Sequence, residues 1–158
     1  MYDRILVPTD GGEHAIAAAR HAVELAGAFD ATVHAVYVVD TETSWLTVSK
    51  SEVRSALESV GRGQGQQALS EVEELAADAG VELVTELLEG APDERILAYA
   101  AEHDIDLVVM GTHGRTGVER RILGSVSERV VRSADAPVMT LTADGGNDGE
   151  NGQNNSGE

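Results

Sequence analysis

The fold class follows from one segment of the chain, which reads Asp106-Leu-Val-Val-Met-Gly-Thr-His-Gly114. Its apolar part is continuous and rich in valine, which is typical of a strand in a parallel sheet that is covered on both faces. Two glycines follow at the point where this strand ends. Because ligands of doubly wound sheets bind at the carboxyl ends of the strands, the segment predicts a buried strand that leads into a candidate binding loop.

Four further apolar runs lie outside this segment. They read Ile5-Leu-Val-Pro8, Thr32-Val-His-Ala-Val-Tyr-Val-Val39, Leu83-Val-Thr-Glu-Leu-Leu88 and Pro137-Val-Met-Thr-Leu141. Helical patterns separate the runs, and Pro92 suits the first turn of one of these helices. The residues expected on buried helix faces are Ile16, Ala19, Val23, Ala26, Leu69, Val72, Leu75, Ala79, Ile96, Leu97, Ala100, Ala101, Val126, Val130 and Val131. Since strands and helices alternate, the sequence predicts an α/β fold with a doubly wound, five-stranded parallel sheet and helices on both faces.

The stretch after the second run predicts a loop around Thr41–Lys50 and then a long helix. Three glycines at Gly61, Gly63 and Gly65 weaken that helix, so a break at the glycines is an alternative. Gly63 and Gly65, with Ala68, also fit a loose dinucleotide-binding pattern. That pattern needs a strand before it and a helix opening after it, so we reject this interpretation here.

Length and composition indicate a single globular domain, because the chain has 158 residues of which 42% are apolar. The stretch Asp144–Glu158 contains no apolar residue and cannot offset the entropy of its own ordering. We expect a folded domain over residues 1–142 and a disordered acidic tail, rich in glycine and asparagine, over residues 143–158. The chain has no cysteine, which excludes a disulfide scaffold, a thiolate metal site and a cysteine nucleophile.

The formal net charge of −17 argues against duplex nucleic acid and anionic membranes as partners. Only one of the 11 basic residues is a lysine. Such a surface resembles that of proteins from halophilic organisms, whose carboxylates are screened by molar salt. An ordinary acidic protein with an acidic tail is the alternative. However, only four acids lie in the last fifteen residues, so the rest of the chain keeps 24 acids against 11 bases.

No apolar run approaches the roughly 20 residues that span a membrane. A strand-like segment begins directly after the first few residues, so we expect no signal peptide. The sequence therefore predicts a cytoplasmic protein.

The candidate binding loop continues to Gly124-Ser125, where a helix is expected to begin. Glycines let the backbone approach a ligand closely, and the free N–H groups of a helix start attract anions. These features suit the phosphate chain of a nucleotide. However, Ser125-Val-Ser-Glu128 is also a capping-box pattern. A glycine-rich turn followed by an ordinary cap therefore remains open, since one hydroxyl cannot use the same lone pairs for both roles.

These residues resemble the glycine signature of universal stress protein domains, which is spaced here as Gly111, two residues, Gly114, nine residues, Gly124 and Ser125. The opening segment 5–13 and the segment 136–138 are similar to that family as well. The resemblance covers residues 2–142. One departure is Gly12, where the family usually has a serine.

The resemblance implies a Rossmann-like sheet in the strand order 3-2-1-4-5 and a homodimer. The last strand is apolar and would be an exposed edge, which needs pairing or protection. Pairing between two copies would use Val138, Met139, Thr140 and Leu141. The resemblance also implies ATP as the ligand, with Mg²⁺ or Mn²⁺, because this chain keeps the full glycine signature of the ATP-binding members.

The family's binding positions map onto this sequence one by one. Asp10 would reach the adenosine, although it could also cap the helix that begins near Gly12. Pro8 and Thr9 would shape the wall of the site beside the adenosine. The backbone of Val38 would read adenine, and Met110 would pack near the base or ribose. The residues that would hold the ribose and phosphates are Gly111, Gly114, Gly124, Ser125 and Val126.

The histidines and arginines give weaker signals. His113 lies between two loop glycines, and we interpret it as facing solvent rather than as catalytic. His34 has no evident partner, and no group of histidines and carboxylates has metal-ligand spacing. We therefore expect no metal site in the protein and no catalytic residue. Three arginines in the loop either balance phosphate charge or pair with surface acids, and they are Arg115, Arg120 and Arg121.

Together these features predict a stress-response regulatory protein that binds ATP and at most hydrolyses it slowly. One alternative is a dimeric interaction module that binds no ATP, or that binds AMP or another nucleotide. An enzyme of the wider adenine-binding superfamily, such as a nucleotidyl transferase, would need a second substrate domain, for which we expect no room.

Overall fold

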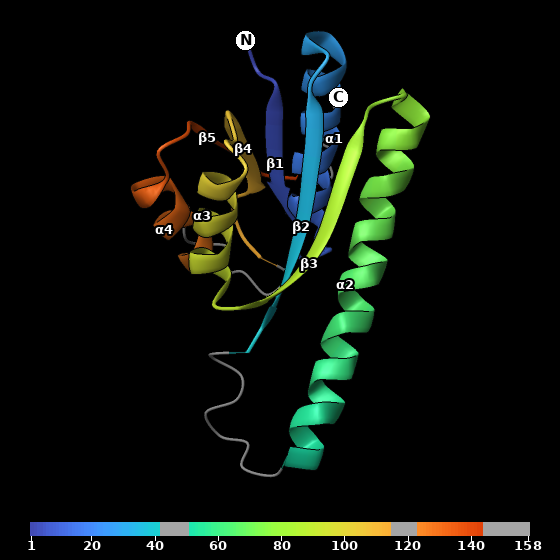
Figure 1. Cartoon of the computed structure of the whole chain (residues 1–158), viewed down its shortest axis with the longest axis vertical. Helices are drawn as coiled ribbons and strands as arrows, with labels where there is room; N and C mark the ends of the chain where they lie inside the picture. The colour runs from blue at the N-terminus through green and yellow to red at the C-terminus, as the bar shows by residue number, and fades with distance from the viewer. Residues whose placement is uncertain (42–50, 115–122, 144–158) are drawn as a thin grey trace, which may run out of the picture.

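The computed structural model describes residues 1–41, 51–114 and 123–143 (Figure 1). The elements run in the order β1 (Arg4–Pro8), α1 (Glu13–Phe29), β2 (Thr32–Asp40), α2 (Ser51–Ala79), β3 (Leu83–Gly90), α3 (Pro92–Glu102), β4 (Leu107–Gly111), α4 (Ser125–Ser133) and β5 (Val138–Leu141). The five predicted strands are confirmed, and each differs from its predicted bounds by at most two residues.

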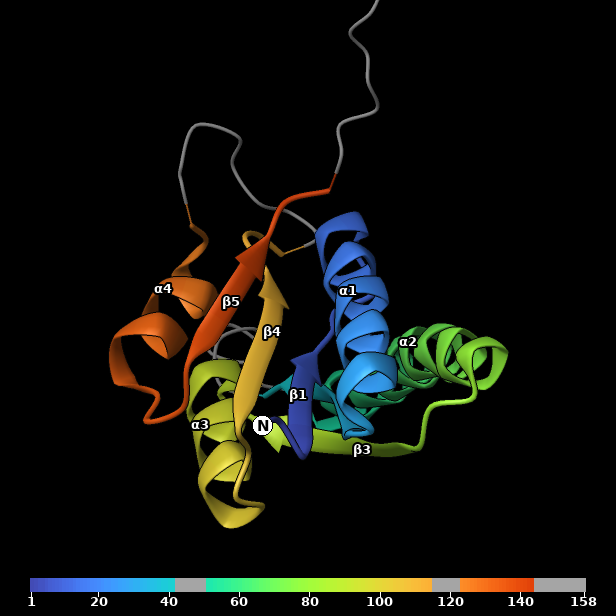
Figure 2. The same cartoon turned by 90° about the horizontal axis from the view of Figure 1, so that it is seen from above.

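All neighbouring strands pair in parallel, in the order β3-β2-β1-β4-β5. Helices α1 and α2 cover one face of the sheet, and α3 and α4 cover the other (Figure 2). The predicted doubly wound sheet and its strand order are therefore confirmed. In such an order β1 and β4 lie side by side at the centre, where their connections leave toward opposite faces and a crevice opens.

Successive residues of the central strands enter two separate cores. Ile5 and Val7 of β1 pack against α1 and α2, whereas Leu6 between them packs against α3 and α4. The face of α1 that meets the sheet is largely alanine, which lets the helix lie close to the strands. The two edge strands are less buried than the centre. The core accordingly consists mainly of small aliphatic side chains.

Helix α2 is continuous through its three glycines, so the break that we considered is absent. A Cβ atom at Gly65 would lie 2.5 Å from Cδ1 of Leu87 and 2.7 Å from Cδ1 of Tyr37. A Cβ atom at Gly61 would lie 2.9 Å from Cγ1 of Val39. The missing side chains allow α2 to pack closely on β2 and β3, and this close packing offsets the low helix propensity of glycine.

Three of the expected buried helix positions are wrong. Ala79, Ala101 and Val131 are exposed. In α4 the buried positions are Ser127 and Val130, because the Ser127 hydroxyl donates to the carbonyl of Gly111 and turns this side of the helix toward the sheet.

Two predictions fall on parts of the chain that the structure does not describe. The loop expected around Thr41–Lys50 lies almost wholly outside the described residues, and so does the expected disordered tail after its first residue. That residue, Ala143, is ordered, because its N–H donates to Nδ1 of His14 at 2.8 Å, so the predicted start of the tail at 143 is wrong. Within the described ranges, every helix is too short or too polar to cross a lipid bilayer.

Candidate functional site

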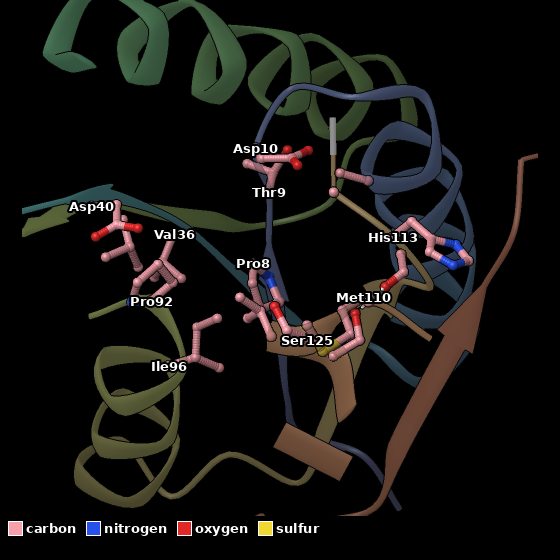
Figure 3. Close-up of a pocket in the computed structure, with 17 residues that line it drawn as sticks. Pro8, Thr9, Asp10, Val36, Asp40, Pro92, Ile96, Met110, His113 and Ser125 are labelled. Carbon is pink, nitrogen blue, oxygen red and sulfur yellow. Dashed lines mark hydrogen bonds between the residues drawn. The ribbon is translucent and has the colours of Figure 1, made fainter. Parts of the chain in front are cut away.

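A cavity of about 490 Å³ opens at the carboxyl ends of β1, β2 and β4 (Figure 3). The first turns of α3 and α4 complete its walls. Asp40, Pro92 and Ile96 lie at one end, which we call the apolar end. Met110 and Ser125 lie toward the other, which we call the loop end because the glycine loop forms it. This position matches the ligand crevice of doubly wound sheets.

All ten residues predicted for the binding site line this one cavity. They are Pro8, Thr9, Asp10, Val38, Met110, Gly111, Gly114, Gly124, Ser125 and Val126. Their places in the sequence span three strands and the start of a helix. The structure therefore brings the whole predicted set together, while its role in binding a nucleotide stays a prediction.

Several wall residues, chiefly at the apolar end, were not predicted from the sequence. Val36 and Asp40 flank the predicted Val38 at intervals of two residues along β2. Alternation along a strand could have identified them, because residues i and i+2 face the same side. Pro92 and Ile96 come from α3, which follows a different strand. No local signal connects them with β2.

The backbone of β2 extends past the end of β1 at the apolar end. Pairing with β1 stops at Pro8, which lies opposite Val36, and the N–H of Thr9 donates to the carbonyl of Val36 at 2.9 Å. Residues of a parallel strand bond alternately to its two neighbours. The N–H and C=O of Val38 therefore face the same side as those of Val36, where β1 no longer continues.

The turn after β1 is held by two side chains. Oδ1 of Asp10 accepts a hydrogen bond from the N–H of Gly12 at 2.8 Å, and Oγ1 of Thr9 accepts one from Gly11 at 3.1 Å. Gly11 has φ 81°, a conformation that favours glycine. Gly12 is the N-cap of α1 and has no side chain with which to cap that helix. Asp10 therefore does not occupy the N-cap position itself, and its carboxylate orders the turn by accepting from the N–H of the N-cap residue.

Three glycines of the loop end differ in how closely their surroundings approach. A Cβ atom at Gly111 would lie 2.8 Å from the backbone of His14 in α1, so this glycine admits the helix rather than a ligand. A Cβ atom at Gly114 would lie 2.9 Å from Oδ2 of Asp10. Gly124 has φ −74°, which any residue adopts, and a Cβ there would meet the carbonyl of Thr112 at 3.4 Å. Close approach explains glycine at Gly111 and Gly114, whereas the contacts at Gly124 have ordinary van der Waals lengths.

Helix α4 begins at Ser125 as predicted, but the expected capping box is absent. Gly124 is the N-cap, so Ser125 is the first residue of the helix and does not occupy the N-cap position that a capping box requires. The Ser125 side chain is exposed at the rim of the cavity. The N–H of Gly124 donates to the carbonyl of Thr112 at 2.6 Å, which joins the two glycine arms of the loop end. The competition between capping and anion binding at Ser125 is thereby removed.

His113 is half-buried rather than solvent-facing, which corrects our interpretation. Its Nδ1 lies 3.1 Å from Oγ1 of Thr112, and its ring lies 5.7 Å from that of His14, measured between centroids. Figure 3 shows the ring turned toward α1. In the described part of the chain, no group of three or more potential ligands could hold a metal ion. The three arginines of the loop lie outside the described residues.

His34 also has a partner, contrary to the sequence analysis. Its Nδ1 lies 2.8 Å from the hydroxyl of Tyr99 in α3, and the Tyr99 ring stacks on that of His103. Burial lowers the pKa of His34, and the neighbouring His103 and Arg4 lower it further, whereas Glu86 opposes the shift. Burial likewise raises the pKa of Tyr99. This cluster lies beneath the apolar end, one helical turn from Ile96.

Comparisons with known proteins agree on one family. The model of the universal stress protein family matches residues 1–141. A universal stress protein of Methanocaldococcus jannaschii is 41% identical over 149 residues, which cover 89% of this chain and 82% of that protein. The solved structure of the universal stress protein UspA from Lactobacillus plantarum has a TM-score of 0.81 and 32% identity, and the match covers 89% of this chain and 97% of that chain.

A third match concerns a protein with a bound ligand. The universal stress protein from Archaeoglobus fulgidus, solved in complex with dAMP, has a TM-score of 0.66 and 23% identity to this chain. The match covers 89% of this chain and 98% of that chain. At this level of identity the likeness shows the fold alone.

Proposed function

The chain belongs to the universal stress protein family, and we propose that it is a regulatory protein that binds an adenine nucleotide, ATP with Mg²⁺ or Mn²⁺, in the cavity at the carboxyl ends of β1, β2 and β4. One observation carries the proposal. A single cavity combines an apolar end that has a backbone donor and acceptor with a loop end built from glycines and a helix start.

The apolar end suits an adenine base. The side chains of Val36, Val38 and Ile96 give it apolar walls. The N–H and C=O of Val38 face the cavity beyond the end of β1. Such a neighbouring donor and acceptor complement N1 and the 6-amino group of adenine, which are an acceptor and a donor. Guanine presents these two groups in the opposite order, so we expect the cavity to prefer adenine.

The loop end suits phosphates. Helix α4 has nine residues, and its first N–H groups lie at the cavity beside Ser125 and Val126. An anion at this end gains hydrogen bonds and a favourable interaction with the helix dipole. The Ser125 hydroxyl is a further donor. Asp10, whose carboxylate lies against Gly114, borders this end and would reach the adenosine, while the nucleotide would bring Mg²⁺ or Mn²⁺ with it.

The experiment measures binding directly. Nucleotide released by denaturing the purified protein is identified by mass spectrometry, and ATP, ADP and AMP are titrated calorimetrically at high salt with Mg²⁺. Gly124→Val places a branched side chain against the 3.4 Å contacts of the loop end. It should weaken ATP binding much more than it lowers the melting temperature. Binding of AMP in preference to ATP would reassign the ligand, and no binding up to millimolar concentration would favour an interaction module with an empty cavity.

Support for an adenine ligand also comes from the Archaeoglobus fulgidus protein, because its complex with dAMP is a member of the same family with the same fold. We assign no catalytic residue and propose at most slow ATP hydrolysis. The cytoplasmic location and the halophilic origin stay predictions of the sequence.

The same proposal includes a homodimer through β5. The four residues Val138–Leu141 are half-buried within one chain, and β5 pairs only with β4 among the described strands. A second copy pairing along its open edge would satisfy the edge backbone groups and protect the edge from other pairing.

A further inference from the structure

The chain segment that follows β5 contacts the loop end of the cavity directly. The N–H of Thr112 donates to the carbonyl of Leu141 at 2.9 Å, which extends the pairing of β4 with β5 by one step. The hydroxyls of Thr112 and Thr142 lie 3.1 Å apart and share a hydrogen bond. Thr112 is almost fully buried. The exit of β5 is therefore fixed to the residue between Gly111 and His113.

A second connection runs through α1. The N–H of Ala143 donates to Nδ1 of His14 at 2.8 Å. The His14 ring lies against that of His113, and the His14 backbone occupies the space that a side chain at Gly111 would need. The hydrogen bond from Ala143 thus holds the first turn of α1 against the segment that contains Gly111 and His113.

Thr112 transmits both connections to the opposite glycine arm. Its carbonyl accepts the 2.6 Å hydrogen bond from Gly124, and Gly124 is the N-cap of α4. Displacement of Thr112 would therefore move the start of α4, where the first N–H groups of that helix lie.

We propose that Thr142 and Ala143 are positioning residues for the loop end, so that phosphate binding and the anchoring of the chain after β5 are thermodynamically linked. This inference rests on the proposed function for its ligand. Linkage between two binding events is reciprocal, so phosphates bound at the loop end should in turn strengthen the Ala143–His14 hydrogen bond. A base bound at the apolar end should have little effect on the Ala143–His14 hydrogen bond.

The test compares Ala143→Pro, which lacks the N–H donor, with Ala143→Gly, which keeps it. Loss of one such hydrogen bond should weaken ATP binding about three- to tenfold in the proline variant, measured by calorimetry with Mg²⁺. Adenosine, which has no phosphate, should bind both variants and the wild type within about twofold, and ATP should bind the glycine variant as it binds the wild type. An equal loss for ATP and adenosine would overturn the proposal, because it would indicate general destabilisation.

A second pair of variants tests the hydroxyl contact in the same way. Thr142→Val should weaken ATP binding, and Thr142→Ser should restore it. In the Thr112→Val background the Thr142→Val change should have almost no further effect, since the shared hydrogen bond is already gone. Fully additive effects of the two valine substitutions would contradict the assigned contact.

A readout without ligand separates this inference from the proposed function. Hydrogen exchange of the Gly124 amide in the unliganded protein should be faster in Ala143→Pro than in Ala143→Gly. If the wild type binds no nucleotide, the proposed function fails, but faster exchange would still support the positioning role. Unchanged exchange together with unchanged ATP affinity would overturn it.

Discussion

Ser125 and Ser127 lie two residues apart in the first turn of α4 and have different surroundings. Ser125 is exposed at the cavity, whereas Ser127 is buried and donates to the Gly111 carbonyl at 2.8 Å. Ser125→Ala should weaken ATP binding about tenfold and leave the melting temperature unchanged. Ser127→Ala leaves a buried carbonyl without its partner and should cost about 1–3 kcal/mol of stability. Urea denaturation and calorimetry on both variants check the pair, and equal stabilities would contradict it.

The shifted pKa of His34 makes stability depend on pH. Because burial lowers the pKa in the folded state below its ordinary value of 6.5, the unfolded chain binds more protons as the pH falls through that value. Stability should therefore be full above pH 6.5 and decline below it. The free energy of unfolding, measured at pH 7.5 and 5.5, should fall less in His34→Gln than in the wild type. His21→Gln, outside this cluster, should keep the wild-type decline, and identical declines in all three would remove His34 as the cause.

At the scale of elements, α2 shows how glycine can stabilise a helix through its packing. Gly65 faces β2 and β3 closely, while a Cβ atom at Gly63 would meet nothing within 4 Å. Gly65→Ala should cost about 1–3 kcal/mol through overpacking, despite the better helix propensity of alanine. Gly63→Ala, two residues earlier in the same helix, should gain about 0.5–1 kcal/mol. Chemical denaturation measures both, and a gain at Gly65 would show that the contacts relax without cost.

The register of β5 shows which backbone groups are available to a second copy. The carbonyl of Pro137 accepts a hydrogen bond from Val108 of β4, and the carbonyl of Leu141 accepts one from Thr112, the residue after β4. The backbone N–H and C=O groups of the odd-numbered residues of β5 therefore face β4. The N–H of Thr140 then faces the open edge. Thr140→Pro should yield a folded monomer, whereas Met139→Pro would break pairing within one chain and lower stability. Light scattering at micromolar concentration checks the masses, and a dimeric Thr140→Pro protein would place the interface elsewhere.

At the scale of the whole molecule, the charge of −17 sets the response to salt. The Debye length falls from about 10 Å at 0.1 M salt to about 3 Å at 1 M, so repulsion between surface carboxylates is strongly screened. The melting temperature should rise markedly from dilute buffer to molar KCl. A scan in sucrose of matched osmolality controls for solute exclusion. A melting temperature that does not change with KCl would favour the alternative, an ordinary acidic protein.

The sequence contained most of the fold because each strand is a short apolar run and each connection is a helix. Glycines after a strand end mark the loop end of the cavity, as at Gly111, whereas Asp10 and Val38 were predicted through the family resemblance. Pro92 and Ile96 were missed because their approach depends on how α3 packs against β2, which no local pattern encodes. The capping box at Ser125 was wrong because the helix start is fixed by tertiary hydrogen bonds, chiefly that of Ser127, rather than by its own serine.

The unequal lengths of β1 and β2 have a consequence for how this cavity can evolve. In the proposed function, preference for a base depends on main-chain atoms at Val38, which every amino acid except proline supplies. Drift in side chains can therefore reshape the walls while the preference is inherited unchanged. An insertion that extended β1 by two residues would pair with Val38 and abolish the preference, even with every wall residue retained. Redesign of the ligand should accordingly begin with strand length and not with side-chain substitution.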